Sequence, residues 1–530
     1  MENAHLWYRK VATSALYALM RSKSDLLISL LTTMRARLEA AACVAVAPAL
    51  YLHWCIDADY HKNPPIRGPN VTAGTSTCVL AAHFCSPTYF IKPSVQHRIR
   101  EHSPDMYLID TTSYALIHVE QDLDEKPEYA ILSHRWVKHE IIYKTYQQAL
   151  MNDPNFGKPG SDQEASVRKI RGACTVAKQR SLKYIWIDNC CIDKSSSEEL
   201  RTALNSMFAW YHEAAICLTY LGDVTYSSSG NGTFSRDEVS GKKGHQPSEW
   251  FERGWTLQEL LAPRSMQFYD RSWQPMGSRN SLADSVSNIT GISRDYLQDR
   301  GSEALTFRSA SIATRLSWMA GRTTRDVEDI AYSMLGILDV NMVPMYGEGA
   351  EAFSRLQETV MTSPHAFDES LFAWRLPVQG KLDCYRTSAV LESGALGLLA
   401  PSPDCFRRNM NGEEHEEICI QHKDVMRRLG NGFTKTHQGI NFALPLKEMK
   451  SRMTGRDKKE ISLPLNCWIG GNNVVLELVR DSGGFWRRTQ GERLQPKKGA
   501  KVGDNKTFGI DQGSALLGQV TVMQPRLRLR

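Results

Sequence analysis

The stretch Trp250-Phe-Glu-Arg-Gly-Trp-Thr-Leu-Gln-Glu-Leu-Leu-Ala-Pro-Arg-Ser-Met-Gln-Phe-Tyr-Asp270 predicts a helix followed at once by a short strand. Trp255 and Glu259 are four residues apart and share one face of that helix. Pro263 ends the helix, and the apolar run 266–269 has the length of a buried strand. A carboxylate one turn from a large aromatic ring is a candidate site acid whose pKa its environment sets. The alternative interpretation is a core tryptophan beside a solvated glutamate.

Three further apolar runs of the same kind precede this stretch, at 129–133, 184–188 and 215–221. Each is rich in β-forming residues and too short for a helix. Between them, 167–179 and 198–214 have helical spacing. Alternating strands and helices predict an α/β fold, with a four- or five-stranded, mostly parallel sheet over 106–275 and helices on both faces. The strand at 184–187 is expected at the centre, because its apolar run does not alternate with polar residues.

Polar residues follow each predicted strand: Ser133-His134-Arg135, Asp188, Asp223 and Asp270. The carboxyl ends of parallel strands meet at one edge, where open α/β sheets bind ligands. The sequence therefore predicts a site at that edge, although Asp223 and Asp270 are equally well explained as turn formers. His134 has no nucleophile motif beside it and is interpreted as a turn cap. Cys190-Cys191, directly after a strand, is interpreted as packing.

The composition is that of an ordinary globular protein, with 42% hydrophobic and 23% charged residues. The net charge is 64 − 58 = +6, and the basic patches lack interleaved aromatic residues, which argues against nucleic-acid binding. The twelve cysteines form no CxxC pair and have no histidine at zinc-ligand spacing, so we expect no metal and a reducing, cytoplasmic location. The apolar segments are too short to favour a membrane span.

Changes of pattern divide the chain into four parts. Residues 1–105 show no sustained period and are interpreted as a poorly specified N-terminal extension. Residues 106–275 carry the α/β pattern, and residues 276–375 are predominantly helical. Residues 376–530 have short alternating runs split by Gly and Asn, which predict a small β-rich C-terminal module. This module is expected to contact the helical part without adding catalytic groups, so its deletion should leave any activity measurable.

Four blocks of the sequence resemble the fungal heterokaryon-incompatibility (HET) domain. These blocks are Tyr129-Ala-Ile-Leu-Ser-His-Arg-Trp136, Tyr184-Ile-Trp-Ile-Asp-Asn-Cys-Cys-Ile-Asp-Lys194, Ser206-Met-Phe-Ala-Trp-Tyr211 and Arg253-Gly-Trp-Thr-Leu-Gln-Glu-Leu-Leu-Ala-Pro-Arg264. The downstream Arg325-Asp-Val-Glu-Asp-Ile-Ala-Tyr332 and Met345-Tyr-Gly-Glu-Gly349 also fit. The resemblance covers about 106–374. It implies a fungal effector of vegetative incompatibility that promotes cell death on recognition of non-self, with a second copy or a partner incompatibility protein as its expected partner.

The HET blocks in turn resemble the TIR domain, a flavodoxin-like sheet whose enzymatic members cleave NAD at the nicotinamide–ribose bond. Leu132-Ser-His-Arg135 is similar to the first TIR strand and its following loop, and Trp255-Thr-Leu-Gln-Glu259 to the segment with the catalytic glutamate. The resemblance implies that Glu259 is catalytic. It also implies that Ser133 and Arg135 line the nucleotide pocket and that Trp255 forms its wall. Asp188, which follows a strand at the same predicted edge, and Trp136, which belongs to the HET pattern, are further candidates for binding NAD. NAD enters as a substrate, and no cofactor is expected.

This chemistry needs few groups. Breaking the bond builds oxocarbenium character on the ribose, which one buried carboxylate can stabilise, and neutral nicotinamide leaves without a general acid. Arg135 is suited to holding the pyrophosphate in a bidentate ion pair.

The alternative function is a non-enzymatic adaptor that acts by self-association. Its tryptophans would then be core and interface residues, namely Trp136, Trp186, Trp210 and Trp255. Convergence of Glu259, Arg135, Ser133 and Asp188 on one cleft favours the enzyme, whereas a solvent-facing Glu259 favours the adaptor.

Overall fold

The computed structural model describes much of the chain from residue 105 to residue 523, all of it within one compact unit, residues 91–530. The described ranges are 105–120, 126–226, 234–237, 246–298, 306–363, 368–375, 397–407, 418–420, 433–436, 439–445, 453–454, 460–469, 472–480, 486–488 and 517–523. The predicted N-terminal extension, 1–105, thus lies outside the described residues except for its last position.

The first sheet has seven strands, and four neighbouring strands in its middle run parallel to one another. Across the sheet the strands are β2 (Leu116–Val119), β1 (Met106–Asp110), β4 (Tyr184–Trp186), β3 (Tyr129–His134), β5 (Ile216–Tyr220), β6 (Met266–Tyr269) and β7 (Pro275–Ser278). Strands β4, β3, β5 and β6 are parallel, and β1, β2 and β7 add antiparallel pairs at the two edges. Every residue of β3 and β5 is buried, as expected for strands covered on both faces.

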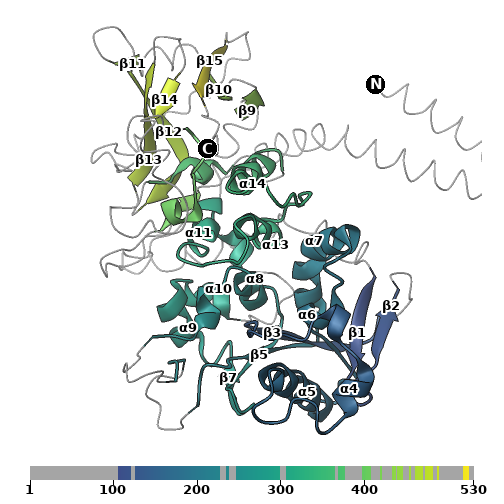
Figure 1. The fold of residues 1–530 in the computed structure, drawn as a ribbon. Coiled ribbons are helices and arrows are strands. Elements are labelled where there is room, and N and C mark those ends of the chain that lie inside the picture. The colour runs from purple at the N-terminus through teal and green to yellow at the C-terminus, as the bar shows by residue number, and fades with distance from the viewer. Residues whose placement is uncertain are drawn as a thin grey trace, which may run out of the picture. The chain divides into compact units, whose positions relative to one another are not determined.

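Helices cover both faces of this sheet (Figure 1). The helical elements are η2 (Tyr143–Thr145), α4 (Gln148–Asn152), α5 (Glu164–Gln179), α6 (Asp188–Cys191), α7 (Ser197–Glu213), η3 (Glu249–Glu252) and α8 (Thr256–Leu261). Figure 1 shows α5 on one side of the sheet and α7 with α8 on the other. The start of α7 follows from its sequence, because Ser196 Oγ accepts the backbone N–H of Glu199 at 3.3 Å.

The order β4-β3-β5-β6 gives the sheet a topological switch point. From β3 the chain passes through α5 to β4, and it then returns past β3 through α7 to β5. The first crossover thus runs from β3 to one side, and the second runs from β4 back across β3 to the other side, as in flavodoxin-like sheets. The carboxyl ends of β3 and β5 therefore border the crevice where such sheets bind ligands.

The predicted α/β class is confirmed, with two corrections of detail. The sheet has seven strands rather than four or five, because β1, β2 and β7 extend its edges. These strands are short, and β2 is half exposed, so they lack the long apolar runs by which the interior strands were predicted. The middle strand is β3, and the predicted strand at 184–187 is its neighbour β4. Both strands are interior, and an apolar run indicates burial on two faces without indicating which of them is central.

Short helices make up the next part of the chain. They are α9 (Ala283–Thr290), α10 (Arg294–Leu297), η4 (Thr306–Ser309), α11 (Ile312–Ser317), α12 (Asp329–Tyr332), α13 (Leu335–Leu338), α14 (Glu351–Met361) and η5 (Glu369–Phe372). The helical spacing at 326–338 is realised as the two short helices α12 and α13, which Ser333 and Met334 separate. Packing of α13 on α7 and α8 joins this part to the first sheet.

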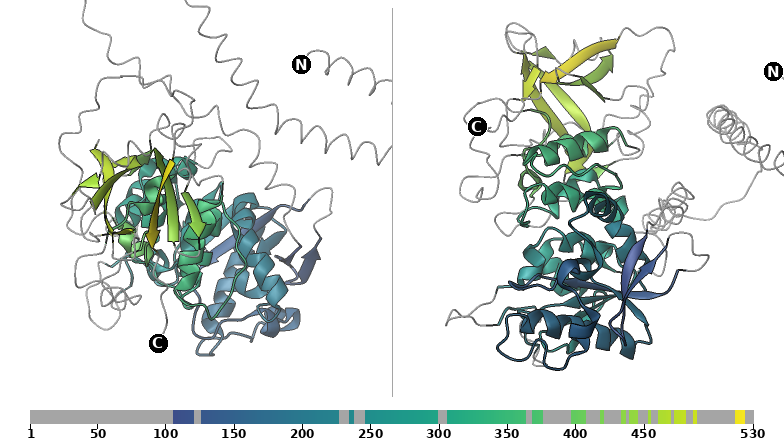
Figure 2. Two further views of the ribbon diagram at one scale, coloured as in Figure 1. Left: turned by 90° about the horizontal axis from the view of Figure 1, so that it is seen from above. Right: turned by 45° about the vertical axis from the view of Figure 1, so that its right-hand side comes forward.

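The C-terminal strands form a sheet of their own, visible in the views of Figure 2. They are β8 (Cys419–Ile420), β9 (Phe433–Thr436), β10 (Gly439–Pro445), β11 (Met453–Thr454), β12 (Glu460–Ile469), β13 (Asn472–Arg480), β14 (Trp486–Arg488) and β15 (Leu517–Met523), preceded by η6 (Pro403–Phe406). All its pairs are antiparallel except β14 with β15. In β13 the buried residues alternate, Val474, Leu476 and Leu478, which is the pattern that predicted a β-rich part here. The boundaries at 275 and 375 stay predictions.

Candidate functional site

Strand β3 delivers Ser133 to the switch point. Ser133 lies opposite Thr219 of the parallel strand β5, near the carboxyl ends of both strands. Its side chain is fully buried and points toward the face that carries α8. The neighbouring His134 faces the other way, as the two-residue period of a strand requires. One strand thus places polar side chains on both faces of the sheet.

Helix α8 brings Glu259 to Ser133. The helix follows Trp255, its N-cap residue, and ends just before Pro263, as the sequence predicts. All six of its residues are buried, and Glu259 is only 7% exposed. Ser133 Oγ donates to Glu259 Oε2 at 2.5 Å, and it accepts the indole N–H of Trp250 at 2.9 Å. The result is a buried chain of hydrogen bonds from an indole, through a hydroxyl, to a carboxyl group.

Burial dominates the acidity of this carboxyl group. It raises the pKa of Glu259 to about 8, and the negative charge of Asp188 acts in the same direction. Hydrogen bonds from Ser133 and Tyr211 and the positive charge of Arg253 oppose the shift. Without a ligand, Glu259 is therefore mostly protonated at neutral pH. A cation placed beside it would favour the ionised form.

Asp188 forms the second part of the site. It is the first residue of α6, immediately after β4, and accepts the indole N–H of Trp136 at 3.0 Å through Oδ2. Lys194 Nζ lies 3.5 Å from the same Oδ2 and 3.9 Å from the centroid of the Trp136 ring. The indole is thus fixed at its edge by a carboxylate and covered on its face by a cation.

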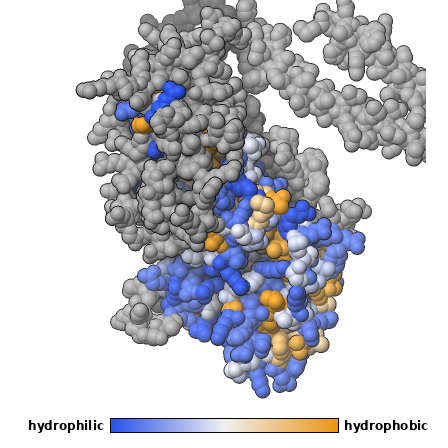
Figure 3. Space-filling model, turned by 45° about the horizontal axis from the view of Figure 1, so that its top comes forward, coloured by the Kyte–Doolittle hydropathy of each residue, from blue (hydrophilic) through white to orange (hydrophobic). Residues whose placement is uncertain are grey.

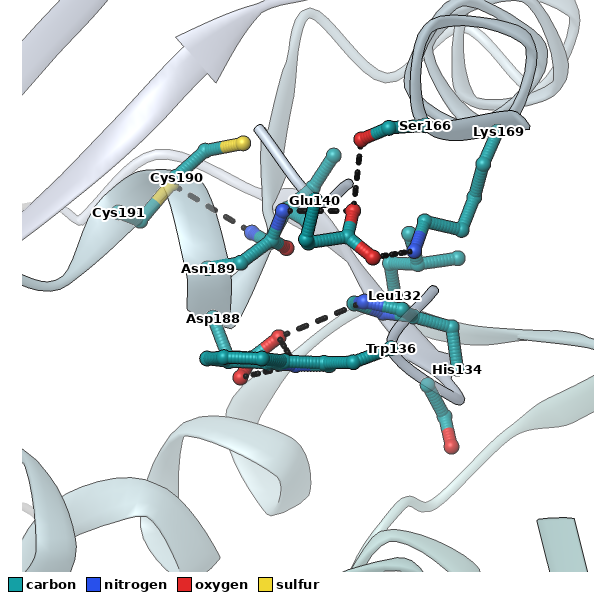
Figure 4. A network of polar contacts seen from close by, with 12 residues as sticks. Leu132, His134, Trp136, Glu140, Ser166, Lys169, Asp188, Asn189, Cys190 and Cys191 are labelled. Carbon is teal, nitrogen blue, oxygen red and sulfur yellow. Dashed lines mark hydrogen bonds and ion pairs between the residues drawn. The ribbon is translucent and has the colours of Figure 1, made fainter. Parts of the chain in front are cut away.

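A buried network lies behind Asp188 (Figure 4). Glu140 Oε1 accepts from Ser166 Oγ at 2.7 Å and from Asn189 Nδ2 at 3.0 Å. Glu140 Oε2 pairs with Lys169 Nζ at 2.7 Å, and the Lys169 side chain is fully buried. Because Asn189 belongs to α6, the network orients the helix that carries Asp188. We assign it a structural role.

His134 is not a turn cap, which corrects that interpretation. The residue is buried, and neither ring nitrogen makes a hydrogen bond; Nε2 lies 3.7 Å from Asp188 Oδ1. Burial, with repulsion from Lys169 and Lys194, holds the pKa of His134 well below its usual value. The imidazole is therefore neutral at physiological pH. The packing interpretation of Cys190 and Cys191 is confirmed, since both are buried free thiols.

The predicted site residues fall into two groups and two outlying positions. Ser133 contacts Glu259, and Trp136 contacts Asp188; the influence of Asp188 on the pKa of Glu259 links these groups. The other two predicted residues lie apart. Arg135 is 53% exposed and pairs with Glu249, and the half-buried Trp255 hydrogen-bonds to Asp329. Their roles toward NAD stay predictions.

Three contributors to this site were missed from sequence: Trp250, Tyr211 and Arg322. Trp250 is 1% exposed, and its indole N–H donates to Ser133, which in turn donates to the carboxyl group of Glu259. Tyr211 donates to the Leu132 carbonyl at 3.0 Å and reaches Glu259. Both residues stand in blocks quoted above or directly beside them, so block membership was the available signal. Arg322 lies outside every block.

Arg322 is a buried cation beside the helix of Glu259. Its guanidinium donates to the Trp318 and Arg253 carbonyls at 3.1 and 2.9 Å and to Thr256 Oγ1 at 3.2 Å. Burial lowers the pKa of Arg322 to about 10, against the effect of Glu259. The group stays charged at neutral pH and ties the start of α8 to the helical part of the chain.

The described residues contain no group of three or more His, Cys, Asp or Glu side chains arranged to hold a metal ion. Within the same residues, no helix has both the length and the apolar character that crossing a bilayer demands.

Two segments of this α/β protein are similar to known families. The family described as heterokaryon incompatibility protein (HET) matches residues 129–246, which include Ser133, Trp136 and Asp188. Residues 351–464 match a domain of unknown function, DUF8212.

A particular relative is the vegetative incompatibility protein HET-E-1 of Podospora anserina. It is 42% identical over 240 residues, which are 44% of this chain and 16% of the relative. The chain thus aligns with about one sixth of the length of that protein. No solved structure matches the chain.

Proposed function

We propose that this chain is a fungal effector of vegetative incompatibility that promotes cell death when genetically unlike hyphae fuse. The proposal is supported by the HET domain and by the 42% identity to the vegetative incompatibility protein HET-E-1. The HET match, residues 129–246, includes Ser133, Trp136 and Asp188, so the effector function is assigned to the part of the chain around these residues.

The proposed activity is hydrolysis of NAD at the nicotinamide–ribose bond. The observation that carries it is the contact between Ser133 and Glu259, a buried carboxyl group at the switch point of a flavodoxin-like sheet. A polar pair at this position is unusual for a core, because burying a carboxyl group costs free energy unless it has partners. Burial of this carboxyl group also raises the pKa of Glu259, and a raised pKa is typical of an acid in a functional site.

The reaction balances with water as the only co-reactant. The C1′–N bond breaks, and nicotinamide leaves as a neutral molecule with the bonding electron pair. The ionised Glu259 stabilises the positive charge left on the ribose ring. Water then forms the new bond to C1′, and its proton passes through Glu259 to solvent. The products are nicotinamide, ADP-ribose and one proton.

Ionisation of Glu259 is favoured by the substrate itself. The nicotinamide ring of NAD is cationic, and a positive charge next to a buried carboxylate lowers its pKa. Ser133 and Tyr211 hydrogen-bond to the carboxyl group and favour its charged form in the same way. We assign these two residues to orienting Glu259, and Trp250 to orienting Ser133.

The second candidate function is the adaptor that acts by self-association. Glu259 is not solvent-facing, as the enzyme requires, but a buried carboxyl group with a hydrogen-bond partner is also compatible with a satisfied polar residue of the core. Two of the four tryptophans assigned to it, Trp186 and Trp210, are core residues with ring centroids 5.5 Å apart. Their burial leaves them unavailable for an interface.

The test is incubation of the purified full chain with NAD, with nicotinamide and ADP-ribose quantified by chromatography. Glu164→Gln is a control variant, because it removes a carboxylate that pairs with Arg168 on the surface of α5, away from the predicted NAD-binding residues. We expect release of both products in equal amounts by wild type and by the control. Absence of release, together with a concentration-dependent oligomer in sedimentation, would replace the enzyme by the adaptor.

A further inference from the structure

The segment that carries Glu259 is packed directly on a part of the chain beyond the HET match. Gly254 donates its backbone N–H to the Thr323 carbonyl at 2.9 Å, and Thr323 donates to the Glu252 carbonyl at 2.7 Å. A Cβ atom at Gly254 would come within 2.5 Å of Thr324 Cγ2. The chain just before α8 thus adjoins the chain just before α12 at backbone distance.

This contact brings Asp329 to Trp255. Asp329, the first residue of α12, is 7% exposed and hydrogen-bonds to two aromatic side chains from distant parts of the sequence. The Tyr346 hydroxyl donates to Asp329 Oδ1 at 2.8 Å, and Trp255 provides the second hydrogen bond. Lys194, which covers the Trp136 ring, is near enough to stabilise the charge of Asp329. The charge of Lys194 thus acts on both Asp188 and Asp329.

The loop that holds Tyr346 is fixed by hydrogen bonds. Glu328 Oε1 accepts the backbone N–H groups of Gly347 and Gly349, both at 2.8 Å, and both glycines have positive φ (101° and 60°). Tyr332 Oη accepts the Met345 N–H at 2.7 Å and donates to Glu348 at 2.7 Å. The loop conformation is thus specified on both sides of Tyr346, at positions where glycine has no steric cost.

The fixed loop nevertheless exposes apolar surface. Tyr346 is 46% exposed. Of the six large apolar side chains exposed in the described part of the chain, four belong to this region, namely Val327, Val343, Met345 and Tyr346. The described surface visible in Figure 3 is mostly hydrophilic, with hydrophobic patches scattered over it. An exposed aromatic ring on a preorganised loop loses little entropy when a ligand binds to it.

We propose that Tyr346 and Asp329 form a base-binding pair, in which the Tyr346 ring stacks on a planar base of the dinucleotide and Asp329 fixes the Tyr346 and Trp255 side chains around it. This inference rests on the proposed function and extends it, because it assigns binding of the base to Tyr346, with Asp329 holding the Tyr346 side chain in place. The ligand class is a nucleotide with a flat aromatic base, since the exposed Tyr346 ring and the partly exposed Trp255 ring are both held by Asp329 and offer surfaces on which a base can stack. Asp329 acts as a positioning residue.

The experiment uses the full chain with NAD and three variants. Tyr346→Ala removes the ring, and Tyr346→Phe keeps the ring but removes the hydrogen bond to Asp329. Val343→Ala is the matched control, because Val343 is 57% exposed on the same loop and takes no part in the hydrogen-bond network described here. Turnover gives KM and kcat, the melting temperature reports folding, and saturation-transfer NMR reports contact between NAD protons and the protein.

Tyr346→Ala should raise KM about tenfold with little change in kcat and should weaken the saturation transfer to the base protons. Tyr346→Phe should raise KM about threefold. Val343→Ala should match wild type. A purely structural role would lower the melting temperature of Tyr346→Ala without this separate effect on KM. Wild-type KM in Tyr346→Ala overturns the inference, whether or not self-association changes.

The two proposals fail in different ways. If wild type binds NAD but releases no nicotinamide, the enzymatic function fails, and the loss of saturation transfer in Tyr346→Ala still supports the base-binding pair. If wild type cleaves NAD and Tyr346→Ala does so with unchanged KM, only the base-binding pair fails. If wild type shows neither binding nor cleavage of NAD, both proposals are overturned.

Discussion

At the scale of residues, Ser133 and Glu259 are 126 positions apart in the chain and 2.5 Å apart in the structure. Ser133 stands near the end of β3, and Glu259 lies within α8, which packs against β3. The pKa of Glu259 is therefore a property of the assembled fold, because burial causes most of its rise. Protonation of the Glu259 carboxyl group therefore affects both the stability of the fold and the proposed reaction.

Stability should fall as pH rises between about 5 and 8 because of Glu259. The folded-state pKa is about 8 against an ordinary value of 4.5, so within this range the unfolded chain releases a proton that the folded chain keeps. The stabilisation that comes from keeping Glu259 protonated is fully present below the ordinary pKa of 4.5. It is lost as the pH rises toward 8, by at most about 1.4 kcal/mol of unfolding free energy per pH unit. Glu259→Gln cannot ionise, so urea unfolding at several pH values should show the difference from wild type changing across this window. A pH-independent difference would argue against the raised pKa.

The two tryptophans of the 250–255 segment should differ in their effect on stability. Trp250 is 1% exposed and hydrogen-bonds to Ser133, so Trp250→Ala should cost about 3–5 kcal/mol in the free energy of unfolding. Trp255 is only half buried, so Trp255→Ala should cost roughly 1–2 kcal/mol. Chemical denaturation of the two variants measures both values. Equal losses of unfolding free energy would mean that the difference in burial between the two indoles does not determine how much each stabilises the fold.

The sequence predicted part of the residue-level site. Ser133, Asp188 and Glu259 were predicted from strand ends and from the resemblance, because strand termini and block membership are local signals. Trp250 and Arg322 were not, since their contacts with Ser133 and Thr256 depend on how far-apart segments meet. The sequence also gave no sign that Arg135 pairs with Glu249 at the surface, because that partner enters from η3.

At the scale of elements, the sequence predicts strands and helices well where their buried residues form an unbroken run or follow a regular period. Strands β3, β4, β5 and β6 and helices α5 and α7 were predicted close to their observed bounds, because each has a clear period or an unbroken apolar run. The edge strands β1, β2 and β7 were not, because pairing on one side needs no such run. Strand order was also beyond the sequence pattern, since it is set by the direction of crossovers.

Contact between α7 and α13 depends on Gly336. A Cβ atom there would lie 2.2 Å from Phe208 Cβ, which helix α7 holds in the core. Gly336→Ala should therefore separate the helices and cost about 1–3 kcal/mol, despite the better helix propensity of alanine. Thermal unfolding measures the effect. Arg201→Ala, on the exposed face of α7, is the control and should change the melting temperature little; equal melting temperatures for Gly336→Ala and wild type would show that the helices can adjust.

At the scale of the whole molecule, the C-terminal strands contact the helical part through specific hydrogen bonds. Arg488 of β14 is buried, lies 4.0 Å over the Trp374 ring, and donates to the carbonyls of Phe372 and Trp374. Gln357 of α14 donates to the Ala400 carbonyl at 2.9 Å. These contacts lie away from Ser133 and Glu259 in the hydrogen-bond network. They support the view that the C-terminal part stabilises the protein without adding groups to the site.

Arg488→Ala separates stability from activity. The substitution leaves the Phe372 and Trp374 carbonyls without this donor and should cost about 2–4 kcal/mol. We expect a lower melting temperature and unchanged NAD turnover per folded molecule, measured well below that temperature. Loss of turnover while the variant is fully folded would assign the C-terminal part a role in the site.

The negative charge of Glu259 is proposed to stabilise the positive charge that forms on the ribose, and Glu259→Gln tests this role most directly. The variant keeps the shape and hydrogen-bonding reach of the side chain but cannot become an anion. Nicotinamide release by the full chain should fall about 10²–10³-fold, and toxicity on overexpression should be lost, with the protein still folded at the assay pH. Release of nicotinamide, or killing, at the wild-type level by Glu259→Gln would contradict the account.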